Sequence, residues 1–143
     1  MNTAVQAYEV VGGREVLGIE VAHGLDLARA VRRGFPSQAV QHLLDNGWLT
    51  LAELDHVVMP RKTWSNRKRA GTLTAEQSDR LIRVARVLAL AEETFADRSK
   101  GHDWLRRATT ALGGERPLDL LDTEEGAREV ETVLGRIAHG LAV

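Results

Sequence analysis

A short stretch near the middle of the chain carries side chains that could read and hold DNA. The segment P-R-K-T-W-S-N-R-K-R-A, residues 60–70, contains Arg61, Lys62, Thr63, Ser65, Asn66, Arg67, Lys68 and Arg69. Arginine can read guanine bidentately, asparagine can read adenine, and the remaining basic groups can hold phosphates. We therefore expect these residues to bind DNA, with Trp64 packed in the core instead of stacking on a base.

The distribution of charge along the chain supports a phosphate-binding surface in this region. The net charge is only −1, but residues 60–86 carry eight basic and two acidic side chains, whereas residues 113–143 carry three and seven. A basic stripe of this kind is expected for phosphate contacts, although a charge run is also typical of a solvated helix face. Arg80, Arg83 and Arg86 are expected to extend the basic surface.

Two short helices separated by one tight turn must position these side chains. Residues 50–69 have the proportions of a helix-turn-helix, in which the second helix enters the major groove. Pro60 suits the first turn of that second helix, and Gly71 suits its C-terminal cap. The alternative is an exposed basic helix that Trp64 merely packs against the core.

Local start and stop signals predict the remaining helices. Thr50 with Glu53 and Thr74 with Gln77 are capping boxes, which predict helices over about 51–58 and 75–96. The apolar stripe expected for the second of these helices is Leu81, Val84, Ala85, Leu88 and Ala91. Further helices are expected at 25–33, at 38–45 after the N-cap Ser37, at 104–112, and after the cap Thr123 with an apolar face of Ala127, Val130, Val133, Leu134, Ile137 and Leu141. Residues 4–19 are expected to form a loose arm with one short strand at most, 97–103 a polar break, and 113–121 a turn with a short helical piece.

The composition predicts an all-α protein of one domain or two very small ones. Apolar residues make up 43% and charged residues 27% of the 143 residues, with six aromatics and no cysteine. No apolar run approaches the length of a membrane span, and the first residues lack the basic and apolar pattern of a leader, so we expect a cytoplasmic protein. The expected divisions are an N-terminal arm and first helix (1–34), a helix-turn-helix region (35–97) and a helical C-terminal domain (98–143).

Catalytic patterns are missing from the sequence. The five histidines show no metal-binding spacing, and neither glycine-rich nucleotide motif occurs. Adjacent acids such as Glu92-Glu93 diverge along a helix and do not converge on a substrate. We therefore expect no enzymatic activity, no cofactor and no metal.

A set of residues in the last third follows the spacing of a known family. The set comprises Trp104-Leu105, Leu112-Gly113-Gly114, Pro117-Leu118-Asp119-Leu120-Leu121, Thr123, Gly126, Val130, Leu134 and His139-Gly140. These residues closely resemble the C-terminal toxin-binding domain of the MbcA/ParS/Xre antitoxin family. Residues 61–87 look like the Xre-like segment of the same family, so the resemblance covers about residues 35–141. The chain departs from the family at His139, where a tyrosine is frequent, and near Gly101, where an alanine is common.

The resemblance implies the antitoxin half of a bacterial RES–Xre toxin–antitoxin pair. The partner would be a RES-domain toxin that degrades NAD, and the helix-turn-helix would bind promoter DNA of its own operon and repress transcription. In the family, the C-terminal domain embraces the toxin and the chain end can block the NAD pocket. The toxin-binding residues implied here are Trp104, Leu105, Leu112, Gly113, Leu120, Leu121, Arg136, His139, Gly140, Leu141, Ala142 and Val143.

Two general arguments bear on assembly and on the chain end. Helix-turn-helix proteins usually bind two half-sites about one DNA turn apart, so we expect a homodimer within a larger hetero-oligomer with the toxin. The mostly apolar tail 140–143 can fill a pocket without adding a charged side chain, although a frayed helix end would look the same. Two other functions stay open: a helix-turn-helix regulator with an unrelated protein partner, and a toxin-binding inhibitor without DNA binding.

Overall fold

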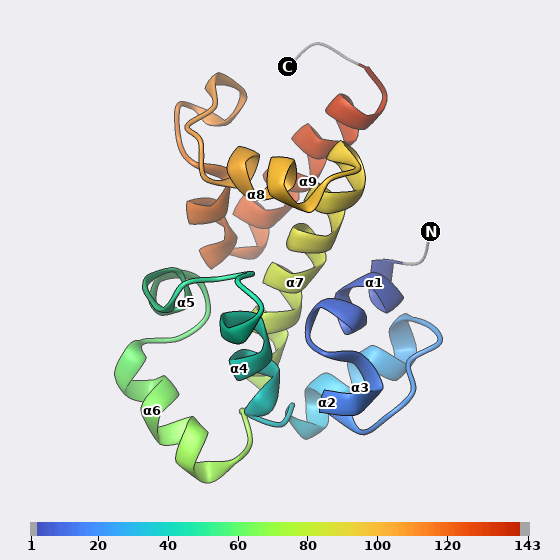
Figure 1. Ribbon diagram of the computed structural model, residues 1–143, viewed down its shortest axis with the longest axis vertical. Helices are drawn as coiled ribbons and strands as arrows, with labels where there is room; N and C mark the ends of the chain where they lie inside the picture. Colours follow the sequence, from blue (N-terminus) through green and yellow to red (C-terminus); the bar gives the residue numbers. More distant parts are fainter. Residues whose placement is uncertain (1–2, 141–143) are drawn as a thin grey trace.

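The computed structural model describes residues 3–140, and helices pack around one long helix, α7 (Figure 1). The α-helices are α1 (Thr3–Val10), α2 (Gly13–Leu17), α3 (Gly24–Arg33), α4 (Gln38–Asp45), α5 (Leu51–Val57), α6 (Arg61–Ala70), α7 (Ala75–Phe95), α8 (Arg98–Leu105) and α9 (Glu124–Ala138), with 3-10 helices η1 (Thr110–Leu112) and η2 (Pro117–Asp122). No strand forms within residues 3–140, which confirms the all-α prediction. None of the helices in this range is long and apolar enough to cross a membrane.

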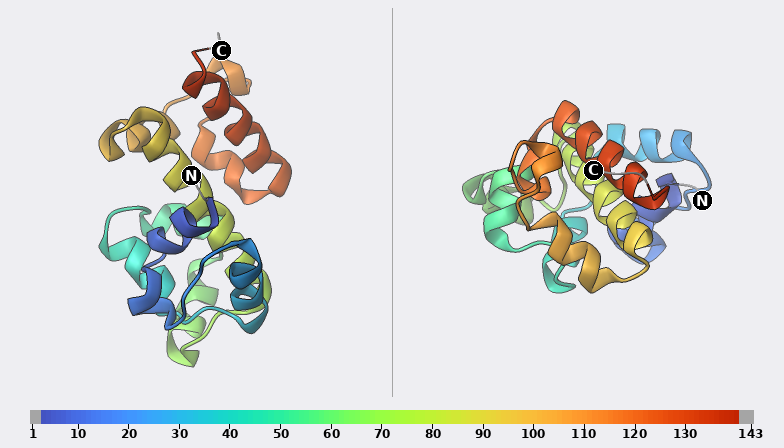
Figure 2. Two further views of the ribbon diagram at one scale, coloured as in Figure 1. Left: turned by 90° about the vertical axis from the view of Figure 1, so that its right-hand side faces the viewer. Right: turned by 90° about the horizontal axis from the view of Figure 1, so that it is seen from above.

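Helix α7 is the axis on which both ends of the molecule are built. Its capping box is confirmed, because Thr74 Oγ1 accepts the Gln77 N–H at 3.1 Å and Gln77 Oε1 accepts the Thr74 N–H at 2.9 Å. Its predicted apolar stripe is fully buried. Helices α1, α3, α8 and α9 all pack against α7, with α3 toward its start and α8 toward its end (Figure 2).

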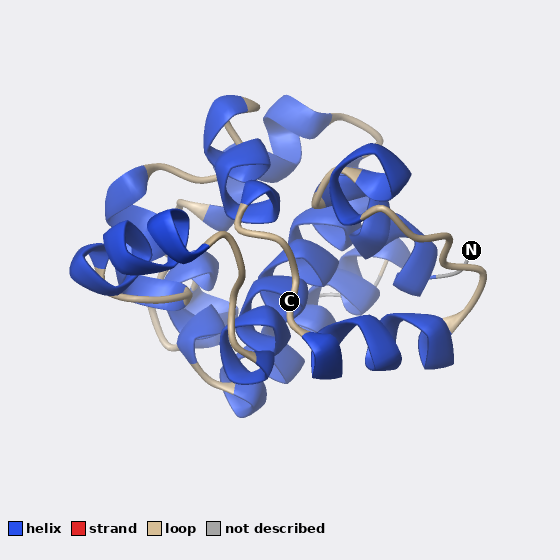
Figure 3. Ribbon diagram, turned by 90° about the horizontal axis from the view of Figure 1, so that it is seen from below, coloured by secondary structure: helices blue, strands red, loops and turns tan. Residues whose placement is uncertain are grey.

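The lower end of the molecule, seen from below in Figure 3, consists of helices joined by short loops. The starts of α4 and α6 differ from the sequence prediction. Ser37 stands at the N-cap of α4, but its side chain makes no capping hydrogen bond. Pro60 is the N-cap of α6 and lies one residue before its first turn. Gly71 ends α6 in the left-handed conformation with φ +86°, as predicted.

The N-terminal segment is helical, and the prediction of a loose arm is wrong. Helix α1 buries Ala7 and Tyr8, the turn after it buries Val11, and α1 packs along α7. The Tyr8 hydroxyl donates to the Ile19 carbonyl at 2.5 Å, which holds the segment after α2 against α1. The helices of this segment depend on packing against α7, and a local sequence pattern does not reveal such packing.

The polar break predicted at residues 97–103 is also wrong, because these residues begin α8. Asp97 caps the helix by accepting the Lys100 N–H at 3.0 Å. Gly101 lets α8 cross α7 closely, since a Cβ there would lie 2.9 Å from the Ala91 backbone. The helix predicted over 104–112 is wrong beyond Leu105, where α8 ends and only the short η1 follows. The turn and short helical piece predicted at 113–121 are confirmed as the glycine turn and η2.

Candidate functional site

The two helices α5 and α6 are fixed against each other at the start of α6. The capping box of α5 is confirmed, because Thr50 Oγ1 accepts the Glu53 N–H at 3.2 Å and Glu53 Oε1 accepts the Thr50 N–H at 2.9 Å. Asp55 Oδ1 accepts the Arg61 N–H at 2.8 Å, so a carboxylate of α5 satisfies a free amide in the first turn of α6. Trp64 is 6% exposed and anchors α6 to the core, as predicted.

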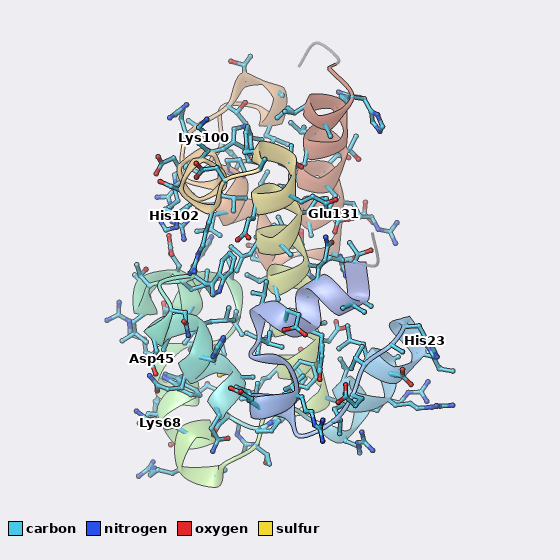
Figure 4. All side chains as sticks on the ribbon, turned by 45° about the vertical axis from the view of Figure 1, so that its right-hand side comes forward. His23, Asp45, Lys68, Lys100, His102 and Glu131 are labelled. Carbon is cyan, nitrogen blue, oxygen red and sulfur yellow. The ribbon has the colours of Figure 1, made fainter. Side chains whose placement is uncertain are left out.

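The outward face of α6 is polar, cationic and open to solvent. Its exposed side chains are Arg61, Lys62, Ser65, Asn66, Lys68 and Arg69, and its half-buried ones are Thr63 and Arg67. Within residues 3–140, none of its five cations forms an ion pair. Arg69 Nη2 donates to Asn66 Oδ1 at 2.7 Å, which orders this end of the face. Figure 4 shows Lys68 on the outer side of α6.

The arginines of α7 do not extend this basic surface, and that prediction is wrong. Arg83 Nε lies 3.0 Å from Glu124 Oε2, and Arg86 Nε lies 2.6 Å from Glu131 Oε1, both acids of α9. Arg80 pairs with a glutamate one turn earlier in α7. Charge counting could not reveal these pairs, because the acids of α9 follow 41 and 45 residues later in the chain.

Some of the residues implied in toxin binding are part of the core of the C-terminal region. The buried members are Leu105, Leu112 and Leu121. Their side chains are inaccessible to a partner in the folded chain and instead support the surface above them. Trp104 and Leu120 are half-buried, and the Trp104 ring packs 5.8 Å from the Phe95 ring, measured between centroids.

Other members of that set lie at the surface of the C-terminal region. Arg136, His139 and Gly140 are exposed at the end of α9, and Gly113 is exposed in the turn after η1. Leu141, Ala142 and Val143 lie outside the described residues. The exposed members from α9 therefore form one patch at the end of this helix, directly before the apolar tail.

An ion pair connects the α5–α6 pair to α8, and the sequence analysis missed it. Arg106 donates from Nε to Glu53 Oε2 at 2.8 Å and from Nη2 to Glu53 Oε1 at 2.9 Å. Nη2 also donates to the Trp48 carbonyl at 3.0 Å. Burial raises the pKa of Glu53, but hydrogen bonds from Arg106 and from the Thr50 N–H outweigh it and hold that pKa below its ordinary value. The sequence contains no signal that a capping glutamate will pair with an arginine 53 residues later.

The described residues offer little that suits catalysis. No group of three or more histidine, aspartate or glutamate residues between positions 3 and 140 is placed to hold a metal ion. A cleft of about 690 Å³ lies between α1, α7 and α8, and its lining combines Trp48 and small apolar side chains with the acids Glu9, Glu92, Glu93 and Asp97. Arg98 at this cleft lies 3.9 Å from the centroid of the Trp48 ring and donates to the Asn46 carbonyl, so its charge is already engaged.

Models of known families match both halves of this arrangement. The antitoxin Xre-like helix-turn-helix domain matches residues 26–86, which include α5 and α6. The antitoxin Xre/MbcA/ParS C-terminal toxin-binding domain matches residues 90–140, which include α8 and α9. The boundary between the two matches falls inside α7, so one helix runs through both domains.

Curated relatives extend the similarity over most of the chain. An Antitoxin Xre from Pseudomonas putida is 32% identical over 121 residues, which are 85% of this chain and 76% of that protein. The chain belongs to the Xre antitoxin family. Another Antitoxin Xre, from Photorhabdus laumondii, is 31% identical over 130 residues, 87% of this chain and 86% of that one. The Prs ADP-ribosylating antitoxin of a Sphingobium species is 35% identical over 86 residues, 52% of this chain and 54% of that one.

The family assignment confirms the resemblance and gives each half of the molecule a general role. This Xre antitoxin is the antitoxin of a toxin–antitoxin system, with a helix-turn-helix DNA-binding domain and a toxin-binding domain. Its partners are therefore a toxin and DNA. The fold prediction of a helix-turn-helix region followed by a small helical C-terminal domain is confirmed as well.

Proposed function

We propose that this Xre antitoxin binds and neutralises a RES-domain toxin that degrades NAD, and that its C-terminal end occludes the toxin active site. The chain itself catalyses no reaction. The observation that supports this role is the exposed end of α9, where Arg136, His139 and Gly140 are open to a partner. Beyond them the sequence Leu141-Ala142-Val143 offers small apolar side chains that suit insertion into a pocket.

The toxin contacts in this proposal come from the surface and not from the leucine core. Trp104, Leu120 and Gly113 contribute the part of the surface around α8 and the 3-10 helices, and the end of α9 contributes the rest. The buried leucines hold this surface in shape. Half-buried aromatic side chains such as Trp104 are frequent anchors of protein interfaces, since they bury a large area at low conformational cost.

The second part of the proposal is that α6 binds the promoter of its own operon and represses it. The α6 residues Arg61, Lys62, Thr63, Ser65, Asn66, Arg67, Lys68 and Arg69 would enter the major groove or contact the backbone beside it. The exposed cations of α6, which form no ion pair within residues 3–140, support this role. Two half-sites would require a homodimer, and the toxin would then be held in a larger hetero-oligomer.

Co-purification tests the toxin part of the proposal. The full chain is co-expressed with a RES-domain toxin and the complex is isolated by size-exclusion chromatography. We expect a stable complex that is weakened by Arg136→Ala combined with His139→Ala. Lys100→Ala is the control, because Lys100 is also an exposed cation and lies on α8. Absence of any complex would contradict the RES-domain assignment and favour a regulator with an unrelated partner.

Titration of promoter DNA with salt tests the second part. Affinity for the duplex upstream of its own gene should fall steeply with salt, because cations that neutralise phosphates release counterions. A chain that forms the toxin complex but shows no such binding would be an inhibitor that uses its helix-turn-helix only as a scaffold.

A further inference from the structure

Helix α3 carries a second group of exposed cations that charge counting along the chain did not detect. Arg29, Arg32 and Arg33 are all exposed. None of them forms an ion pair with another residue between positions 3 and 140. The nearest acid on this helix, Asp26, accepts the Ala22 N–H at 3.0 Å and lies 3.8 Å from His23 Nε2. The charges of Arg29, Arg32 and Arg33 therefore remain available at the surface.

The C-terminal end of α3 is joined firmly to the turn that follows α6. The Leu73 N–H donates to the Phe35 carbonyl at 2.8 Å, and the Ser37 N–H donates to the Gly71 carbonyl at 2.9 Å. At Gly34 a Cβ would lie 2.2 Å from the Leu73 carbonyl oxygen, so the two backbones touch. Residues 34–37, directly after α3, are thus bonded to residues 71–73, directly after α6, and this contact fixes where α3 lies relative to α6.

A contribution to the stability of α3 does not explain why all three positions 29, 32 and 33 are arginine. Cations in the last turn of a helix interact favourably with the helix dipole, which accounts for Arg32 and Arg33. Arg29 lies one turn earlier, where this effect is weak, and it shares the outward face of α3 with Arg32. All three arginines of α7 form ion pairs, so the arginine and lysine side chains without ion pairs in residues 24–86 belong to α3 and α6.

We propose that Arg29, Arg32 and Arg33 form a second phosphate-binding strip, which holds the DNA backbone beside the groove that α6 enters. This inference rests on the proposed DNA binding by α6 and adds contacts from α3, a helix of the same domain that lies outside the α5–α6 pair. Figure 1 shows α3 and α6 at the same end of the molecule, on either side of the first turns of α7. Backbone contacts of this kind set the register of a protein on DNA and are independent of base sequence.

The test measures binding of the full chain by fluorescence anisotropy over a range of salt concentrations. The probes are the duplex upstream of its own gene and an unrelated duplex of equal length. The variant Arg29→Gln/Arg32→Gln is compared with Lys100→Gln/Arg107→Gln, which removes two exposed cations near the other end of the molecule (Figure 4). A third variant, Arg29→Lys/Arg32→Lys, retains the charge, so it separates phosphate binding from a role of the arginine side chains in packing.

We expect Arg29→Gln/Arg32→Gln to bind both duplexes roughly ten-fold more weakly, with a salt slope smaller by about 2. The lysine variant should bind nearly as well as the wild type, and the control variant should keep the wild-type slope. Equal affinity and slope for the two glutamine variants, with Arg61→Ala still impaired, would overturn the strip and leave binding by α6 intact. Absence of salt-dependent binding by the wild type would overturn both proposals.

Discussion

Glu53 and Arg106 join the helix-turn-helix to the toxin-binding domain through two charge-assisted hydrogen bonds. Their side chains are only 13% and 17% exposed, so water screens the pair weakly. Glu53 also closes the capping box of α5, and Arg106 also donates to the His102 carbonyl at 3.0 Å in α8. One carboxylate therefore fixes both the start of α5 and its position against the end of α8.

Glu53→Gln should destabilise the chain although it keeps a residue that can close the capping box. The loss comes from the charge of the pair with Arg106, and hydrogen bonds to charged groups contribute about 1.5–3 kcal/mol each. We expect the free energy of unfolding in urea to fall by about 1–3 kcal/mol. Glu125→Gln, at a glutamate 84% exposed, is the control and should change it little.

The same pair predicts how stability depends on pH. The pKa of Glu53 is lower in the folded chain than its ordinary value, so its stabilisation is complete above the unfolded pKa and is lost as the pH falls through the folded pKa. The difference in unfolding free energy between wild type and Glu53→Gln should therefore shrink below the ordinary glutamate pKa of about 4.3. A difference that stays constant from neutral to acidic pH would show that the charge of Glu53 contributes nothing.

Gly126 and Gly135 of α9 should respond in opposite directions to alanine. A Cβ at Gly126 would lie 1.9 Å from the Leu120 carbonyl oxygen, whereas a Cβ at Gly135 meets nothing within 4 Å. Gly126→Ala should therefore destabilise by about 1–3 kcal/mol through overpacking. Gly135→Ala should stabilise by about 0.5–1 kcal/mol, because it lowers the conformational entropy of the unfolded chain. Thermal unfolding followed by circular dichroism measures both, and equal midpoints would contradict the close packing of α9 on η2.

Arg61→Ala and Arg67→Ala should each weaken promoter binding. Arg61 is exposed at the start of α6, where helix-turn-helix proteins reach base edges, and Arg67 follows two turns later. A lost phosphate contact lowers the salt slope by about 1, whereas a lost base contact relaxes sequence preference at one position. Electrophoretic mobility shifts with promoter and unrelated duplexes distinguish the two roles. Arg107→Ala serves as the control, and binding unaffected by either α6 variant would refute the assignment of α6.

Deletion of residues 140–143 should weaken neutralisation and leave the fold intact. Gly140, the first of the removed residues, is exposed, and the last buried apolar residue between positions 3 and 140 is Leu134. We expect an unchanged thermal midpoint and reduced protection of cells that express the toxin. Full protection by the truncated chain would remove the tail from the mechanism and leave the surface around Trp104 to hold the toxin.

Local sequence signals predicted most of the helices, but they did not predict which residues far apart in the chain contact each other. Both capping boxes and the stripe on α7 were predictable, because N-cap hydrogen bonds and helical periodicity involve residues a few positions apart. Helix α1 was missed, since Tyr8 and its neighbours are ordered by packing on α7. The first residues of α8 are polar, so the sequence pattern did not predict the helix that Asp97 caps.

The residues of the candidate site also divide into those that the sequence predicts and those that only the folded chain reveals. The basic face of α6 could be predicted from the run of basic residues at 61–69. The residue spacing shared with the antitoxin family indicated the C-terminal surface. The pairs of Arg83 with Glu124 and of Glu53 with Arg106 join residues 41 and 53 positions apart, so only the folded chain reveals which charges are neutralised. The exposed arginines of α3 were overlooked because acids elsewhere in residues 1–59 outnumber the basic residues there.

Cellular NAD after toxin induction tests the central claim most directly. A RES-domain toxin is expressed alone, with the full chain, and with the Arg136→Ala/His139→Ala variant, and NAD is measured at fixed times. We predict that NAD falls with the toxin alone, stays near its starting level with the full chain, and falls partly with the variant. An equal loss of NAD with and without the full chain would contradict the claim that this Xre antitoxin neutralises an NAD-degrading toxin.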